Sequence, residues 1–169
     1  TGKSADSKHQ FQVIFIPNKN TITPGDFSSR FGFSINPSGI NQSGIQSQSG
    51  ITADIVGDGK PESIAFSAYL SSVSSGFSVF RNISTPTSIS SASFDQEVSF
   101  SSTSNPFSSY NAKLMAEDLD GDGKKDIIIV ASTGVYVFRN TATEGIINSN
   151  SFDAPGFFGL SSYSYLLGR

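Results

Sequence analysis

The stretch that most constrains the fold is an acidic loop at residues 118–126, with the sequence Asp-Leu-Asp-Gly-Asp-Gly-Lys-Lys-Asp. Its four carboxylates stand at positions 1, 3, 5 and 9, and glycines at positions 4 and 6 let the backbone turn tightly. Carboxylates on alternate residues of a tight loop converge and repel one another. The stretch therefore predicts a bound cation or, if the Asp-Gly pairs only mark a turn, a hairpin without an ion.

Calcium fits this donor set, because it takes roughly 6–8 oxygen ligands from carboxylates and backbone carbonyls. The expected ligands are the side chains of Asp118, Asp120, Asp122 and Asp126 and the backbone carbonyl of Lys124. A helix–loop–helix calcium site would need a glutamate at position 12, where this chain has Ile129. The aliphatic run at 127–130 instead indicates that the loop joins two strands.

An earlier copy of the loop lies at residues 54–62, offset by 64 residues. Val56 replaces the acid at position 3 and Glu62 replaces the aspartate at position 9, so calcium is expected to bind weakly there or not at all. The expected ligands of this degenerate site are Asp54, Asp58, Glu62 and the carbonyl of Lys60. The block at 134–140 likewise matches the block at 76–82, which lies 58 residues earlier, and resembles 13–18.

These matches predict a four-stranded antiparallel unit of about 60 residues in an all-β chain. Each unit runs from a first strand through the acidic loop to a second strand, then through a hairpin to a third strand ending in Arg-Asn, and then to a fourth. The predicted strands are 11–16, 31–35, 51–55, 63–69, 76–80, 94–100, 113–116, 127–131, 135–138, 152–158 and 163–167. Residues 36–50 are predicted to form a long loop or a weak edge strand.

The acidic loop, the aliphatic run and the Val-Tyr-Val-Phe-Arg-Asn block resemble the FG-GAP/VCBS repeat. That family includes the calcium-bearing blades of integrin α-subunit propellers and many bacterial surface proteins. The resemblance covers most of residues 9–169 and is strongest over 116–140. It implies a partial β-propeller whose calcium loops join the first two strands of each blade, with the metal residues named above.

The resulting division has about two full blades with partial blades on either side. It comprises a loosely ordered lead-in at 1–8, a partial blade with a linker loop at 9–50, a blade with the degenerate loop at 51–100, a blade with the intact loop at 101–158, and the first strand of a next blade at 159–169. Such an arrangement leaves open sheet edges, which indicates a slice of a larger propeller. The alternative is self-association through those edges, or a filament of such pieces.

Composition narrows the function classes. The chain has Cys 0, which excludes a disulfide framework and a zinc–thiolate site, and its 11 Lys+Arg residues are scattered at a net charge of −3, which argues against nucleic acid. No apolar run approaches the length of a membrane span. The single histidine, His9, lies in a polar terminal stretch, so a Ser-His-Asp or Cys-His centre is hard to assemble, and no enzymatic activity is expected.

The expected function is a non-enzymatic, extracellular interaction or adhesion module with structural calcium and a protein or glycan partner. Extracellular placement follows from the family resemblance and from the calcium concentration outside cells, which fills weak sites. One alternative is a carbohydrate-binding, lectin-like propeller. Others are a structural subunit of a surface filament and an accessory part of a secreted enzyme.

Several further residues recur or stand out. Arg81 and Arg139 end equivalent strands, where a salt bridge between blades or a carbonyl contact is expected. The recurring aromatic residues are predicted to form the core between blades: Phe77, Phe80, Phe94, Tyr136, Phe138 and Phe152. The aromatic residues left for a binding surface are Tyr69, Phe107, Tyr110, Tyr163 and Tyr165. Asn41 and Asn82 fit the glycosylation triplet.

Overall fold

The computed structural model describes residues 10–14, 30–34, 45–69, 75–85, 90–102 and 112–159, which form ten strands and one short 3-10 helix. The first two strands are β1 (Gln10–Ile14) and β2 (Arg30–Ser34). The next elements are β3 (Ile45–Ala53), β4 (Glu62–Tyr69), β5 (Ser75–Phe80), the helix η2 (Ser91–Ser93) and β6 (Val98–Ser102). The last four strands are β7 (Lys113–Glu117), β8 (Asp126–Ala131), β9 (Gly134–Phe138) and β10 (Gly156–Gly159).

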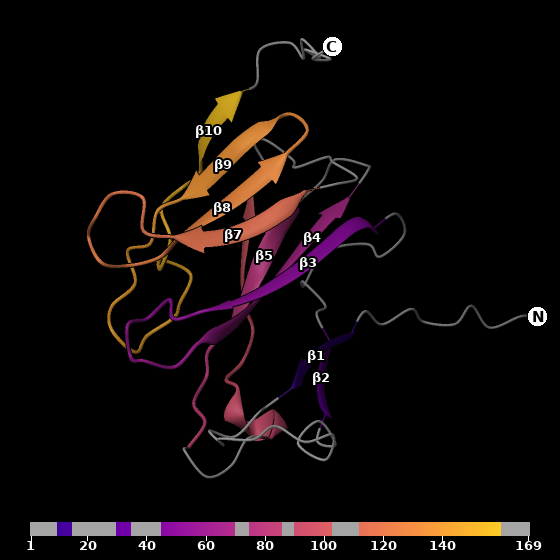
Figure 1. The fold of residues 1–169 in the computed structure, drawn as a ribbon, viewed down its shortest axis with the longest axis vertical. Coiled ribbons are helices and arrows are strands. Elements are labelled where there is room, and N and C mark those ends of the chain that lie inside the picture. The colour runs from indigo at the N-terminus through magenta and orange to yellow at the C-terminus, as the bar shows by residue number, and fades with distance from the viewer. Residues whose placement is uncertain are drawn as a thin grey trace, which may run out of the picture.

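Two four-stranded antiparallel sheets make up most of the described chain (Figure 1). The first sheet has the order β3-β4-β5-β6 and the second has the order β10-β9-β8-β7, so consecutive strands are neighbours in both. An acidic loop joins the first two strands of each sheet. Strands β1 and β2 form a separate antiparallel pair. The chain is therefore all-β, as predicted.

Strand positions agree closely with the sequence prediction in the middle of each sheet. The predicted strands at 63–69, 76–80, 113–116, 127–131 and 135–138 correspond to β4, β5, β7, β8 and β9 within one residue at each end. Strand β3 begins at Ile45, inside the stretch predicted as a loop or weak edge strand, and it is an edge strand of the first sheet.

The fourth strands start later than predicted. Phe94 and Phe152 form isolated bridges with Asn82 and Asn140, and the regular ladders begin only at Val98 and Gly156. In the second sheet Pro155 precedes the ladder directly, and proline has no N–H to donate. The predicted strands at 94–100 and 152–158 therefore each divide into a bridge, a gap and a short ladder.

The main core lies between the two sheets. The first sheet contributes Ile64, Phe66, Phe77 and Val79, and the second contributes Ile127, Ile129, Tyr136 and Phe138, all almost fully buried. The ring of Phe77 meets the rings of Phe138 and Phe152 edge-on, with centroids 5.0 and 5.2 Å apart. Strand β3 contacts β7, so the two sheets also approach through their first strands (Figure 1).

The predicted aromatic core is confirmed for Phe77, Tyr136, Phe138 and Phe152. Phe80 and Phe94 differ, because they pack with Ala65 in a smaller cluster. Side chains alternate between the faces of a strand, so Ala65 lies on the face of β4 opposite Ile64 and Phe66. The expected lead-in at 1–8 and the expected strand at 163–167 lie outside the described residues.

Candidate metal centre

The loop at residues 118–126, here called the second loop, leaves β7 and enters β8. Its first aspartate organises the turn, because the N–H groups of Gly121 and Gly123 donate to the two oxygens of Asp118 at 2.7 and 2.9 Å. Both glycines have positive φ, 79° and 85°, which side chains with a Cβ rarely adopt. The Asp-Gly pattern therefore gives a closed turn whose aspartates can point to one side.

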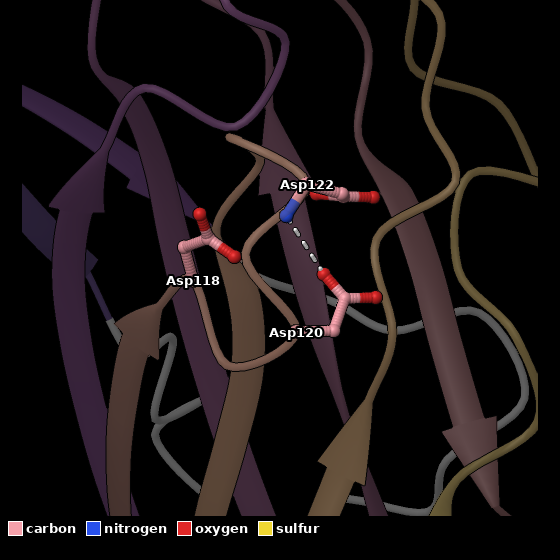
Figure 2. A group of neighbouring side chains, drawn as sticks. All are labelled: Asp118, Asp120 and Asp122. Atoms are coloured by element: carbon pink, nitrogen blue, oxygen red, sulfur yellow. Dashed lines mark hydrogen bonds between the residues drawn. The ribbon is translucent and has the colours of Figure 1, made fainter.

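Three of the predicted ligands come together in this loop. Oxygens of Asp118, Asp120 and Asp122 lie within 4.8 Å of one another, and all three residues are exposed. Figure 2 shows them on one loop, with the Asp122 N–H donating to Asp120 at 3.2 Å. Within the described residues, these carboxylates form a group close enough to share one ion. Oxygen donors open to solvent suit a hard cation that keeps some of its water.

The fourth aspartate of the loop, Asp126, accepts hydrogen bonds from backbone N–H groups. Asp126 is 2% exposed, and its oxygens accept hydrogen bonds from the N–H of Leu119 at 3.0 Å and of Asn140 at 2.9 Å. Asp126 thereby ties the loop to the end of β9. The Lys124 N–H donates to Asp122 at 2.9 Å, which leaves the Lys124 carbonyl as the group predicted to face a metal. Metal binding by Asp126 and by Lys124 stays a prediction.

A side chain that the sequence prediction had not placed in this loop neutralises two of its acids. Arg139 Nε donates to Asp120 at 2.5 Å, and Arg139 Nη2 donates to Asp122 at 3.3 Å. The hydrogen bond from Arg139 lowers the pKa of Asp120, and Asp120 in turn raises the pKa of Arg139. A contact between blades was expected for Arg139. Arg139 instead forms an ion pair with the acidic loop of its own sheet. The signal in the sequence was that each acidic loop is followed by a strand that ends in Arg-Asn.

The loop at residues 54–62, here called the first loop, has nearly the same internal hydrogen bonds. Gly57 and Gly59 donate to Asp54 at 2.8 and 2.9 Å, Lys60 donates to Asp58 at 3.0 Å, and Ile55 donates to Glu62 at 2.7 Å. Arg81 lies 3.8 Å from Asp58, which parallels the pair of Arg139 and Asp122. The turn thus forms without an acid at position 3.

Glu62 has the same bracing role as Asp126. It is fully buried and also accepts longer hydrogen bonds, both at 3.4 Å, from the N–H groups of Val56 and Asn82. Burial is the main cause that raises the pKa of Glu62, and the backbone donors oppose it. The predicted weak ligands therefore divide into Glu62, which faces the interior, and Asp54 and Asp58, which remain partly exposed.

The segment between β9 and β10 covers the first loop. The Gly145 N–H donates to the Val56 carbonyl at 3.0 Å, and Val56 is buried. An aspartate at this position would lose its solvation beneath a neighbouring segment, which explains a valine there. Between the loops remains a cleft of about 270 Å³, lined by residues 54–57, residues 123–125, Ala142 and Glu144.

The asparagine at the end of β9 links the two loops. The Asn140 side-chain amide donates to the carbonyls of Ile55 and Lys125, both at 2.9 Å, and its oxygen accepts from the Ala142 N–H. Asn82 makes the matching local bonds, to the Pro61 carbonyl and from the Ser84 N–H, both at 3.0 Å. Because Asn82 is buried and bonded in this way, its triplet is not an accessible glycosylation site in the folded chain.

The structure does not describe the side chains of the other residues that the sequence singled out. His9, Asn41, Phe107, Tyr110, Tyr163 and Tyr165 lie outside the described residues, and Tyr69 is placed only as a backbone position in β4. No helix within the described ranges has the length and apolar character needed to cross a bilayer.

In comparisons with known proteins, no family model, curated protein or solved structure matches the chain.

Proposed function

We propose that this chain is a calcium-stabilised, non-enzymatic interaction module that adheres to a protein or glycan partner outside the cell. The observation that carries the proposal is the convergence of Asp118, Asp120 and Asp122 on one exposed loop between two strands. The resemblance of this loop to the FG-GAP/VCBS repeat supports the same assignment.

Calcium is the proposed ion because every donor is an oxygen atom and the loop is open to solvent. Asp118, Asp120 and Asp122 would hold it by side chain, with Asp126 and the Lys124 carbonyl completing the set. When bound, calcium supplies a fixed positive charge that offsets the repulsion of the carboxylates. Binding to the folded state alone would add to the free energy of unfolding.

A stabilising role suits the charges of the loop better than proton transfer does. A general acid at neutral pH needs a raised pKa, whereas Arg139 lowers the pKa of Asp120. Among the described residues, Glu62 is the carboxyl group whose pKa is raised, and it is fully buried and so cannot reach a substrate. These features favour a scaffold whose partner binds elsewhere on the surface.

The proposed architecture is a set of propeller blades. Its support is that both sheets are four-stranded meanders with an acidic loop between their first two strands. The packing of one sheet face on another, with β3 beside β7, is the arrangement that neighbouring blades require. Extracellular action is proposed because an exposed site with few protein ligands would fill only at high calcium concentration.

Calcium titration by calorimetry, together with thermal unfolding in calcium and in EDTA, tests the proposal. We expect a single site with a Kd of roughly 0.1–1 mM and a melting temperature several degrees lower in EDTA. Asp122→Asn should abolish most of this difference, because it removes a charged ligand.

Asp58→Asn is the matched control, since Asp58 occupies the same position of the first loop and makes the same bond to the following lysine N–H. It should leave the calcium-dependent gain unchanged. An identical melting temperature in calcium and EDTA, with no heat of binding, would refute the metal assignment.

A further inference from the structure

All three Asp-Gly bonds of the chain lie in the two acidic loops. One is at residues 58–59 in the first loop, and the other two are at residues 120–121 and 122–123 in the second loop. Glycine has no Cβ, so its nitrogen can reach the preceding aspartate side chain with little steric hindrance. Asp-Gly bonds are therefore the places where a backbone nitrogen most readily attacks a carboxyl group and rearranges the chain.

This rearrangement passes through a cyclic imide. The glycine nitrogen bonds to the aspartate Cγ, and the carboxyl O–H leaves as water together with the amide proton, which gives a five-membered succinimide. Water then opens the ring at one of its two carbonyls. Opening at Cγ restores aspartate, whereas opening at the main-chain carbonyl gives isoaspartate, in which the chain runs through the side chain. The reaction needs only water, and the final mass equals that of the original chain.

In both loops the attacking nitrogen is held by the first aspartate. The Gly59 N–H donates to Asp54 at 2.9 Å. The N–H groups of Gly121 and Gly123 donate to the two oxygens of Asp118 at 2.7 and 2.9 Å. To attack, each nitrogen must lose its proton and turn toward the preceding side chain. The hydrogen bond to the first aspartate must therefore break before the rearrangement can begin.

The carboxylates that would be attacked are held as well. Asp58 and Asp122 each accept a hydrogen bond from the lysine N–H two residues later, at 3.0 and 2.9 Å, and Asp120 accepts one from the Asp122 N–H at 3.2 Å. We propose that Asp58, Asp120 and Asp122 are latent sites of isoaspartate formation, restrained because the first aspartate of each loop holds the glycine N–H. The proposal does not rest on calcium binding.

The two loops differ in their access to water. The side chain of Asp58 is 18% exposed, whereas those of Asp122 and Asp120 are 28% and 36% exposed. Local opening is easier where fewer contacts must break, so isoaspartate should accumulate first in the second loop.

Peptide mapping by mass spectrometry tests the proposal, after the full chain is incubated in EDTA at neutral pH and below its melting temperature. Isoaspartyl methyltransferase labelling verifies the product. Asp118→Ala should raise the rate of isoaspartate formation at Asp120 and Asp122 about tenfold or more, the factor expected when a hydrogen bond to a charged acceptor is lost. The rate at Asp58 should not change. Asp54→Ala is the matched control and should raise the rate at Asp58 alone.

The wild-type chain in guanidinium chloride gives the unrestrained rate, and circular dichroism verifies that each variant is folded. Asp118→Asn keeps one acceptor oxygen and should show a smaller rise, so it serves as the second variant if the alanine variant does not fold. A folded wild-type chain that reacts as fast as the unfolded chain would overturn the proposal. The same holds for a folded Asp118 variant with no rise in the second loop, or with an equal rise at Asp58.

Discussion

The two acidic loops share one turn and differ in what covers them. In both, the first aspartate binds two glycine N–H groups and the ninth residue is a buried acid bonded to the end of the third strand. The first loop is covered by the segment between β9 and β10, and its Ile55 is 1% exposed. The second loop is open, and its Leu119 is 55% exposed. Packing supports one loop, whereas the other is open and carries a third exposed acid, Asp120.

The largest expected effect comes from the residue that joins the two loops. Asn140→Ala leaves the carbonyls of Ile55 and Lys125 without their side-chain donor, so we expect a loss of about 2–4 kcal/mol in the free energy of unfolding. Urea denaturation measures it. Asn82→Ala is the control and should cost less, because the Asn82 side chain bonds to Pro61 and Ser84, which belong to the same sheet unit. Equal losses would show that the link between the sheets contributes little.

Next in size is the buried acid of the first loop. Glu62→Gln turns an amide N–H₂ toward backbone donors, so we expect a loss of about 1–3 kcal/mol in the free energy of unfolding. The calcium-dependent gain should remain. Asp120→Ala should show the reverse pattern. It should change the melting temperature little in EDTA, and it should remove most of the increase that calcium produces. Thermal unfolding in both buffers separates the two roles, and matching effects would mean that the loops do not differ as described.

The arginine of the second loop should compete with a cation. Arg139→Gln removes the charge that neutralises Asp120 and Asp122 in the absence of metal, so calcium should bind a few-fold more tightly by calorimetry. Arg81→Gln, the equivalent change beside the first loop, should leave calcium affinity unchanged. Weaker binding by Arg139→Gln would show that this arginine supports the site.

The smallest effect is a difference in pH dependence. The raised pKa of Glu62 means that the folded state binds its proton more tightly, so its contribution is greatest below the ordinary glutamate pKa and declines as the pH rises through the raised folded value. The lowered pKa of Asp120 acts oppositely, since its contribution is present above the ordinary aspartate pKa and is lost as the pH falls through the lowered value.

Urea denaturation between pH 3 and 7 checks these signs, on a scale set by the ordinary carboxyl pKa values of about 4. Glu62→Gln should remove the first trend, and Arg139→Gln should reduce the second. A wild-type profile that neither variant changes would contradict both assignments.

Much of the fold could be predicted because its signals are local. Alternating and aliphatic runs located β4, β5, β7, β8 and β9 within a residue, and the Asp-Gly pairs located both loops. The fourth strands were misplaced, because Phe94 and Phe152 look like strand residues but form only single bridges. The pairing of Arg139 with Asp120 was missed although both recurring motifs were visible, since nothing in the spacing shows which way the side chain turns.

The sequence by itself determined the two acidic turns and the all-β character, because aspartate–amide hydrogen bonds and side-chain alternation act within a few residues. Only the tertiary structure decided which loop is covered and which is open. That choice depends on contacts such as the bond from Asn140 to the Ile55 carbonyl, which joins residues 85 apart. Local pattern does not encode such a contact, so it could not show that Val56 is buried by the segment between β9 and β10 while Asp120 lies on an exposed loop and pairs with Arg139.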